Sequence, residues 1–157
     1  MPFVTESQGG VRGAEHLIHL EQEQAQHLPD WRCPCCGGLG GRQSLVARGT
    51  PPCILLQILR FEAGPGGLRK LHAPFPVPWE GLRIAALRDG AVVGLARYRL
   101  LAVLLHDGEL AGGHYRALAL RQGDWFCMDD SSSSRLSGGC PAGFEQQVYG
   151  LLLQRDG

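Results

Sequence analysis

A histidine and two neighbouring aspartates in the second half of this chain have the types and spacing needed for proton-transfer chemistry. His114 follows the pair Gly112-Gly113, and Asp129-Asp130 begins 129 − 114 = 15 positions after the histidine. A cysteine or serine nucleophile needs a base to accept its proton, and that base needs a third group to fix its tautomer. The same residues also suit a surface histidine and a strand-ending acidic turn. Spacing alone leaves both interpretations open.

The segments beside this pair predict a β-hairpin that would bring the histidine and the first aspartate together. Residues 115–120 and 125–128 are strand-forming, and 121–124 supply a turn that contains glycine. His114 would open the first strand, and Asp129 would end the second. We therefore expect the two side chains to lie within hydrogen-bonding distance.

The rest of the chain predicts an α+β fold that is mainly antiparallel β. An amphipathic helix is expected over 14–28, ended by Pro29, because its apolar residues recur near i, i+3 and i+4 spacing. A glycine-rich loop follows over 29–50. Apolar runs bounded by proline or glycine predict buried strands. These runs are 54–61, 98–105 and 148–153, while 73–81 is expected to be extended and 131–134 to be an exposed serine loop.

Composition excludes several classes of function. The 15 basic residues are balanced by 15 acidic ones, so no charge excess indicates a nucleic-acid partner. The apolar run in the middle of the chain, residues 100–105, is far shorter than the roughly 20 residues of a membrane span. The N-terminus has no signal-peptide pattern, and three of the six cysteines crowd into residues 33–36. An intracellular, reducing location is therefore expected.

Five ordered blocks between residues 30 and 153 resemble the ubiquitin-specific proteases, which are cysteine peptidases of the ubiquitin carboxyl-terminal hydrolase type. In chain order the blocks are Pro52 with Ile54 to Phe61, Lys70-Leu71 with Phe75-Pro76, Tyr98 to Gly108, Gly112 to Tyr115 with Trp125 to Asp130, and Tyr149 to Leu153. The resemblance implies that residues 1–157 are the C-terminal part of a papain-like catalytic domain. Residues 29–50 would belong to its zinc-binding fingers, and 51–153 would form the strands of its palm.

The resemblance also implies roles for individual residues. His114 would be the general base that forms a thiolate–imidazolium pair with a catalytic cysteine, and Asp129 would orient the imidazole. Asp130 would be an auxiliary acid, and it is the alternative to Asp129 in the triad. The activity implied is hydrolysis of the isopeptide bond after the C-terminal glycine of ubiquitin.

The substrate channel follows from the same resemblance. Gly112 and Gly113 would flank a narrow passage that admits the Gly-Gly tail of ubiquitin, because residues without side chains leave room for an extended backbone. Tyr115 would either pack beneath this channel or be an ordinary core tyrosine. Ubiquitin or ubiquitinated proteins are thus the partners implied.

The nucleophile of the family does not have a counterpart in this sequence. The family's cysteine lies far upstream of the histidine, in a box with asparagine and glycine just ahead of it. Cys33, Cys35, Cys36 and Cys53 precede His114, yet none lies in such a box. Two interpretations stay open: a fragment of a protease whose cysteine-bearing half is missing, or an inactive pseudo-protease that binds ubiquitin.

The pair Cys33-x-x-Cys36 resembles half of the zinc site in the family's fingers. Zinc prefers four tetrahedral ligands, and two thiolates provide only half of them. Cys35 or His27 could replace a missing ligand, or the cysteines could be free thiols. A zinc-stabilised interaction module without a role in ubiquitin chemistry is therefore a further alternative.

Overall fold

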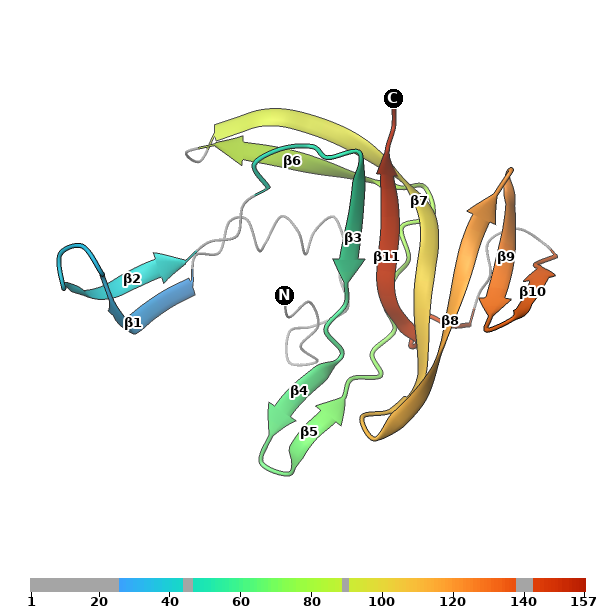
Figure 1. Cartoon of the computed structure of the whole chain (residues 1–157), viewed down its shortest axis with the longest axis horizontal. Coiled ribbons are helices and arrows are strands. Elements are labelled where there is room, and N and C mark those ends of the chain that lie inside the picture. Colours follow the sequence, from blue (N-terminus) through green and yellow to red (C-terminus); the bar gives the residue numbers. More distant parts are fainter. Residues whose placement is uncertain (1–25, 44–46, 89–90, 138–142) are drawn as a thin grey trace.

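The computed structural model describes residues 26–43, 47–88, 91–137 and 143–157. These described residues form eleven strands and no helix (Figure 1). No helix among them is long and apolar enough to cross a membrane. Residues 14–25 of the helix expected over 14–28 lie outside the described residues, but the mainly antiparallel β architecture is confirmed.

One antiparallel sheet dominates the molecule, with the strand order β10-β9-β8-β7-β11-β3 and with β6 also paired to β7. The longest strand, β7, pairs with β11 along one edge, and with β6 and then β8 along the other. The bounds are β3 Cys53–Gln57, β6 Leu82–Arg88, β7 Ala91–Glu109, β8 Gly112–Arg121, β9 Asp124–Asp129, β10 Ser132–Arg135 and β11 Val148–Arg155.

The prediction that the helix continues to residue 28 is wrong. Residues 26–28 belong to β1 (Gln26–Arg32), which pairs with β2 (Leu39–Gln43), so 29–50 contains a hairpin rather than only a loop. Pro29 lies inside β1, next to an irregularity in the strand register. Proline lacks the N–H that a regular ladder uses, and such irregular edges tolerate it.

The strand expected over 54–61 is divided. It forms β3 up to Gln57, and the chain then changes direction so that β4 (Phe61–Gly64) pairs with β5 (Gly67–Lys70). The break lies where Arg60 turns inward and donates to four main-chain carbonyls, which a continuous strand would not allow.

Two further differences concern the edges of the main sheet. The serine segment expected as a loop forms β10, although its side chains are exposed as expected. The strand β6 was not predicted; it forms a hairpin with the first part of β7, from Arg88 opposite Ala91 to Leu82 opposite Tyr98. The predicted strands at 98–105 and 148–153 are confirmed within β7 and β11.

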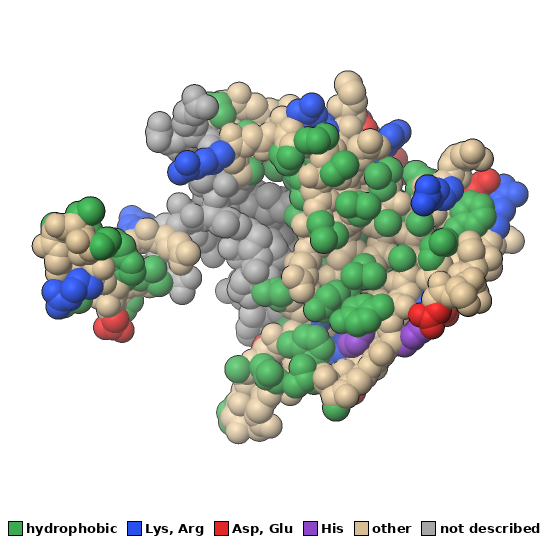
Figure 2. Space-filling model, viewed as in Figure 1, with side chains coloured by type: hydrophobic (Ala, Val, Ile, Leu, Met, Phe, Trp, Pro, Cys, Tyr) green, Lys and Arg blue, Asp and Glu red, His purple; other side chains and the backbone are tan. Residues whose placement is uncertain are grey.

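The two faces of the main sheet differ in what covers them. One face packs into the core, which includes Tyr98, Val103, Leu118, Val148, Leu151 and Leu153. The opposite face carries hydrophobic side chains toward solvent (Figure 2), among them Leu55 and Leu152, which are 70% and 37% exposed. The candidate site lies at one end of this sheet, where β8 begins and β9 ends.

Candidate functional site

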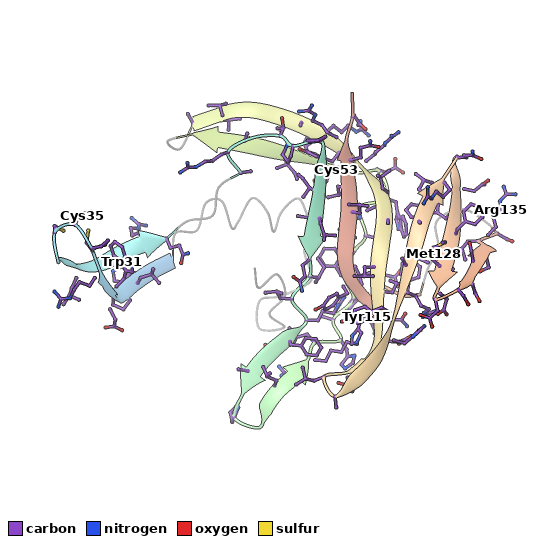
Figure 3. The ribbon with its side chains drawn as sticks, viewed as in Figure 1. Trp31, Cys35, Cys53, Tyr115, Met128 and Arg135 are labelled. Atoms are coloured by element: carbon purple, nitrogen blue, oxygen red, sulfur yellow. The ribbon has the colours of Figure 1, made fainter. Side chains whose placement is uncertain are left out.

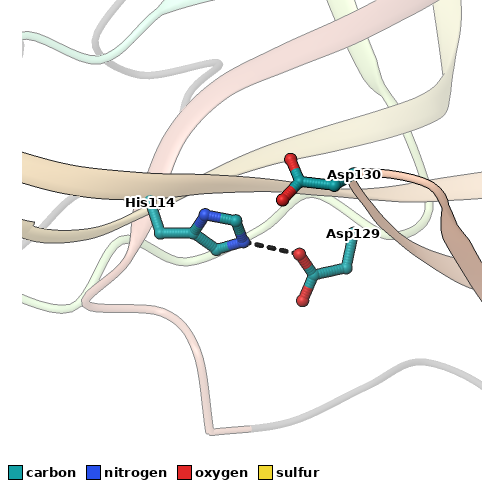
Figure 4. A group of neighbouring side chains, drawn as sticks. All are labelled: His114, Asp129 and Asp130. Atoms are coloured by element: carbon teal, nitrogen blue, oxygen red, sulfur yellow. Dashed lines mark hydrogen bonds and ion pairs between the residues drawn. The ribbon is translucent and has the colours of Figure 1, made fainter.

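The hairpin of β8 and β9 assembles the predicted pair. Gln122 and Gly123 both have positive φ, 52° and 91°, as a tight two-residue hairpin turn requires. The two strands then return in register, with Ala117 opposite Met128. His114 Nε2 lies 2.5 Å from Asp129 Oδ1 (Figure 4). The predicted contact between these two side chains is therefore present.

The geometry fixes which nitrogen of the imidazole carries the proton. A carboxylate only accepts hydrogen bonds, so His114 Nε2–H is the donor to Asp129. Nδ1 is then left to accept a proton, and no described residue hydrogen-bonds to it. The arrangement is that of a base whose tautomer is fixed by a carboxylate.

The electrostatics favour the protonated histidine. The hydrogen bond with Asp129 raises the pKa of His114, the charge of Asp129 adds to this, and the charge of Asp130 contributes less. The side chains of His114 and Asp129 are 47% and 43% exposed. The site is thus open to solvent on this chain and is not enclosed by the described residues.

Asp130 lies beside the pair without bonding to the histidine. Its φ is 48°, and it begins the short turn between β9 and β10. A ring nitrogen of His114 and one carboxylate oxygen each of Asp129 and Asp130 lie within 4.8 Å of one another. Figure 4 shows the Asp130 carboxylate near the imidazole, while the hydrogen bond goes to Asp129. The imidazole thus bonds to Asp129 and not to Asp130, and the role of Asp129 as the orienting residue stays a prediction.

The two glycines before the histidine have different surroundings. A side chain at Gly112 would have no atom within 4 Å. A Cβ at Gly113 would lie 2.2 Å from His106 Nε2 and 2.3 Å from the Asp107 carbonyl oxygen. The protein's own packing therefore requires glycine at position 113. Of the two glycines, Gly112 is the one that borders open space.

Tyr115 is not a core tyrosine, because it is 49% exposed. Its ring lies 4.5 Å from that of His106 and 5.6 Å from that of Tyr149. These three rings form an aromatic group on the β7, β8 and β11 strands, close to Gly113. His106 itself is buried, and its Nδ1 has no hydrogen-bond partner among the described residues.

Arg116 is a neighbour of the site that motif matching did not single out as functional. Its Nη2 donates to Asp107 Oδ2 at 3.0 Å and to Gln147 Oε1 at 3.1 Å. Its charge slightly opposes the rise in the pKa of His114. Strand alternation could have revealed it, because residues 114 and 116 share one face of β8.

The cysteines of the described residues lie elsewhere. Figure 3 shows Cys35 in the separate β1–β2 hairpin and Cys53 at one end of β3, both distant from Tyr115, which follows the histidine. Among the described cysteines, none hydrogen-bonds to His114. Cys127 lies within β9 and pairs across the ladder with Leu118.

The predicted half zinc site lies at the tip of the β1–β2 hairpin. Cys33 N–H donates to the Gly38 carbonyl, and Gly37 N–H donates back to the Cys33 carbonyl. Backbone hydrogen bonds, first from Cys36 and then from Cys35, lower the pKa of the Cys33 thiol. A thiolate is the form that ligates zinc. Zinc binding at Cys33 and Cys36 stays a prediction.

Comparison with known proteins decides the family. Residues 17–151 match the sequence model of the family described as ubiquitin carboxyl-terminal hydrolase. The chain belongs to this family. Its resemblance to ubiquitin-specific proteases, inferred from the motifs, is thus confirmed.

Relatives in the family are much longer than this chain. The probable ubiquitin carboxyl-terminal hydrolase 4 of Schizosaccharomyces pombe is 26% identical over 134 residues, which are 77% of this chain and 23% of that protein. Human ubiquitin carboxyl-terminal hydrolase 15 is 32% identical over 110 residues, 68% of this chain and 11% of that protein. The chain therefore spans about a quarter or less of these relatives.

Solved structures share the fold at lower identity. A SAGA DUB module of Ubp8, Sgf11, Sus1 and Sgf73 bound to monoubiquitin matches with a TM-score of 0.63 and 21% identity, covering 93% of this chain and 33% of the matched chain. The same module bound to ubiquitin aldehyde matches with a TM-score of 0.59 and 21% identity. These matches show that the strands form part of the fold of such catalytic domains.

Proposed function

We propose that this chain provides the base and orienting carboxylate of a thiol-dependent deubiquitinase. The observation that carries the proposal is the contact of His114 Nε2 with Asp129 Oδ1, which leaves Nδ1 free to face a thiol. Membership of the ubiquitin carboxyl-terminal hydrolase family supports the same reaction. The bond cleaved would be the isopeptide bond after the C-terminal glycine of ubiquitin.

The proposed chemistry uses each part of the pair. His114 Nδ1 takes the proton of a cysteine thiol, and the thiolate attacks the carbonyl carbon of the scissile bond. The resulting imidazolium donates its Nδ1 proton to the departing amine, which leaves an acyl-enzyme. Water, deprotonated by the neutral His114, then releases the ubiquitin carboxylate and restores the thiol. Asp129 stabilises the imidazolium in both steps, as the raised pKa of His114 indicates.

The nucleophile in this proposal comes from a segment other than the described residues. No described cysteine hydrogen-bonds to His114, and the solved relatives are about three times as long as this chain. Taken alone, the chain would hold a base without a thiol and would not cut ubiquitin. The alternative is a pseudo-protease that binds ubiquitin without cleaving it, and both versions use the same surface.

The ubiquitin tail would pass beside Gly112 and Tyr115. Gly112 borders open space, and the half-exposed ring of Tyr115 is held in place by His106. An extended Gly-Gly backbone needs such a passage without side chains. Cys33 and Cys36 would provide two ligands of a structural zinc site, with the remaining two from outside this hairpin.

Two measurements on the isolated chain test this proposal. A ubiquitin probe with a C-terminal electrophile should not label the chain, and covalent labelling would overturn the claim that the nucleophile is missing. Titration with ubiquitin, followed by NMR, should shift the amide signals of Gly112, Gly113 and His114.

A matched pair of variants sharpens the titration. His114→Ala should weaken these shifts, whereas His72→Ala should not, because His72 is an exposed histidine whose nearest charged partner is Glu109. If ubiquitin leaves the signals of the wild-type site unchanged, a ubiquitin role for this chain is refuted. Adding a cysteine-bearing half of a family catalytic domain distinguishes the two versions of the proposal. Cleavage of ubiquitin is expected if the chain is a fragment of a protease, and no cleavage is expected if it is a pseudo-protease.

A further inference from the structure

We propose that Lys70 is a positioning residue for His114: it clamps the end of β7 that sets where β8 begins. This inference rests on the proposed function of His114. Lys70 is the last residue of β5, and it is only 8% exposed. Its Nζ donates to the carbonyl oxygen of His106 at 3.0 Å and to that of Gly108 at 2.5 Å.

The two carbonyls need a donor because the sheet provides none there. His106 N–H donates to the Gln147 carbonyl, so the main-chain groups of His106 point away from β8 and toward β11. The β11 strand begins only at Val148, opposite Leu105. Beyond that point, Lys70 takes the place of a neighbouring strand.

The clamped residues lie directly behind the candidate site. In the β7–β8 ladder, His106 is opposite Tyr115, Asp107 is opposite His114, and Gly108 is opposite Gly113. Lys70 thus holds the carbonyls of the two residues that flank Asp107, and Asp107 is the residue opposite His114.

Close packing passes any movement of β7 on to β8. Gly108 has a φ of +102°, and a Cβ there would lie 2.6 Å from the Gly112 carbonyl oxygen and 2.7 Å from Gly113 Cα. A Cβ at Gly113 would in turn meet the backbone of Asp107. The strands touch backbone to backbone, so a shift at Gly108 must displace Gly113 and with it His114.

Lys70 is itself held rigidly. It pairs with Phe61 in the β4–β5 hairpin. The next residue, Leu71, donates its N–H to the Arg60 carbonyl, and Arg60 Nη1 donates to the carbonyls of Leu71 and Ala73. Arg60 is fully buried. The ammonium group of Lys70 is therefore placed by the core and not by solvent.

The consequence is a link between a buried lysine and the protonation of the exposed pair. The 2.5 Å contact between His114 and Asp129 joins two strands, β8 and β9. A hydrogen bond weakens steeply when its geometry is disturbed. Loss of the Lys70 clamp should loosen this contact although no atom of Lys70 touches it.

The test is the imidazole titration of His114, measured by NMR on the whole chain. Lys70→Met keeps the apolar stem and removes the ammonium donors. We expect the pKa of His114 to fall toward the ordinary histidine value and the amide signals of Gly108 and Gly113 to shift. Arg69→Met is the matched control: Arg69 is the adjacent residue on β5, and it bonds to Glu62 at the surface. Its substitution should leave the His114 titration unchanged.

Two further variants and readouts complete the test. Lys70→Arg retains a cation and should recover part of the lost pKa shift, which a mere loss of packing would not show. A folded Lys70→Met protein with an unchanged His114 titration overturns the proposal. If Lys70→Met does not fold, an unchanged titration in Lys70→Arg, together with unshifted Gly108 and Gly113 amides, overturns it instead.

The titration requires no ubiquitin, so the two proposals can fail separately. A His114 pKa that responds to Lys70→Met supports the clamp even if ubiquitin does not bind. Ubiquitin binding with an unresponsive His114 pKa would refute the clamp and leave the proposed function standing.

Discussion

Substitution of Gly113 by alanine tests whether this glycine is required by the protein's own packing or by a substrate. The new Cβ would lie 2.2 Å from His106 Nε2 and 2.3 Å from the Asp107 carbonyl oxygen. Both atoms would have to move by about 1 Å to reach ordinary contact distances. One is on a buried ring, and the other belongs to the backbone of β7.

The expected cost follows from this overlap. Adding a methyl group to a tightly packed site costs about 1–3 kcal/mol, and the backbone contact places Gly113→Ala near the top of that range. A loss of about 3 kcal/mol reduces the folding equilibrium constant roughly 150-fold. For a chain of this size it lowers Tm by roughly 6–12 °C.

Gly112→Ala is the matched control, because a Cβ there would meet no atom within 4 Å. We expect its stability to change by less than about 0.5 kcal/mol. Urea denaturation followed by tryptophan fluorescence measures both variants. Equal destabilisation by the two substitutions, or none by Gly113→Ala, would refute the packing argument. A stable Gly112→Ala protein with weakened ubiquitin-induced NMR shifts would assign the substrate passage to Gly112.

Three further expectations concern the pair and the core. Asp129→Asn should lower the pKa of His114, because the main cause of the rise is the hydrogen bond to Asp129. Since folding raises the pKa of His114, the contact between His114 and Asp129 stabilises the folded protein. This contribution is fully present below the ordinary histidine pKa of about 6.5, and it is lost as the pH rises through the pKa of His114 in the folded protein. The difference in urea midpoint between wild type and Asp129→Asn should therefore shrink between pH 6 and 9; a constant difference would contradict this. Arg60→Met should cost at least about 3 kcal/mol in chemical denaturation, because it orphans four main-chain carbonyls; a near-neutral result would show that water replaces the guanidinium. Leu153→Ala should lower the free energy of unfolding by about 2–5 kcal/mol because Leu153 is fully buried. Leu55 is 70% exposed, so Leu55→Ala should change it by less than about 0.5 kcal/mol. A similar loss of stability in both variants would indicate that the exposed face of the sheet is covered in solution.

Local signals were sufficient to predict the hairpin that carries the pair. The spacing of His114 and Asp129, and the glycine in the turn between them, depend on residues that are close in sequence. A two-residue turn with positive φ fixes the register of both strands, so the position of each side chain follows. The family could be recognised for the same reason, since its motifs are short and occur in a fixed order.

Long-range pairing decided the features that could not be predicted. The apolar run 54–61 has the composition of one strand, but it divides because Arg60 finds its carbonyl partners on segments up to 88 residues away. Residues 26–28 have helical periodicity, yet they pair with residues 41–43. A local pattern does not report which distant strand is within reach.

Local sequence patterns were enough to place a histidine and an aspartate on one hairpin and to recognise the family to which their motifs belong. The contacts that support this hairpin could be seen only in the folded chain. The Lys70 ammonium lies against the carbonyls of His106 and Gly108, although these residues are 36 and 38 positions away in the chain. Such contacts form because buried carbonyls must find donors once the sheet ends, and only the folded backbone specifies where it ends.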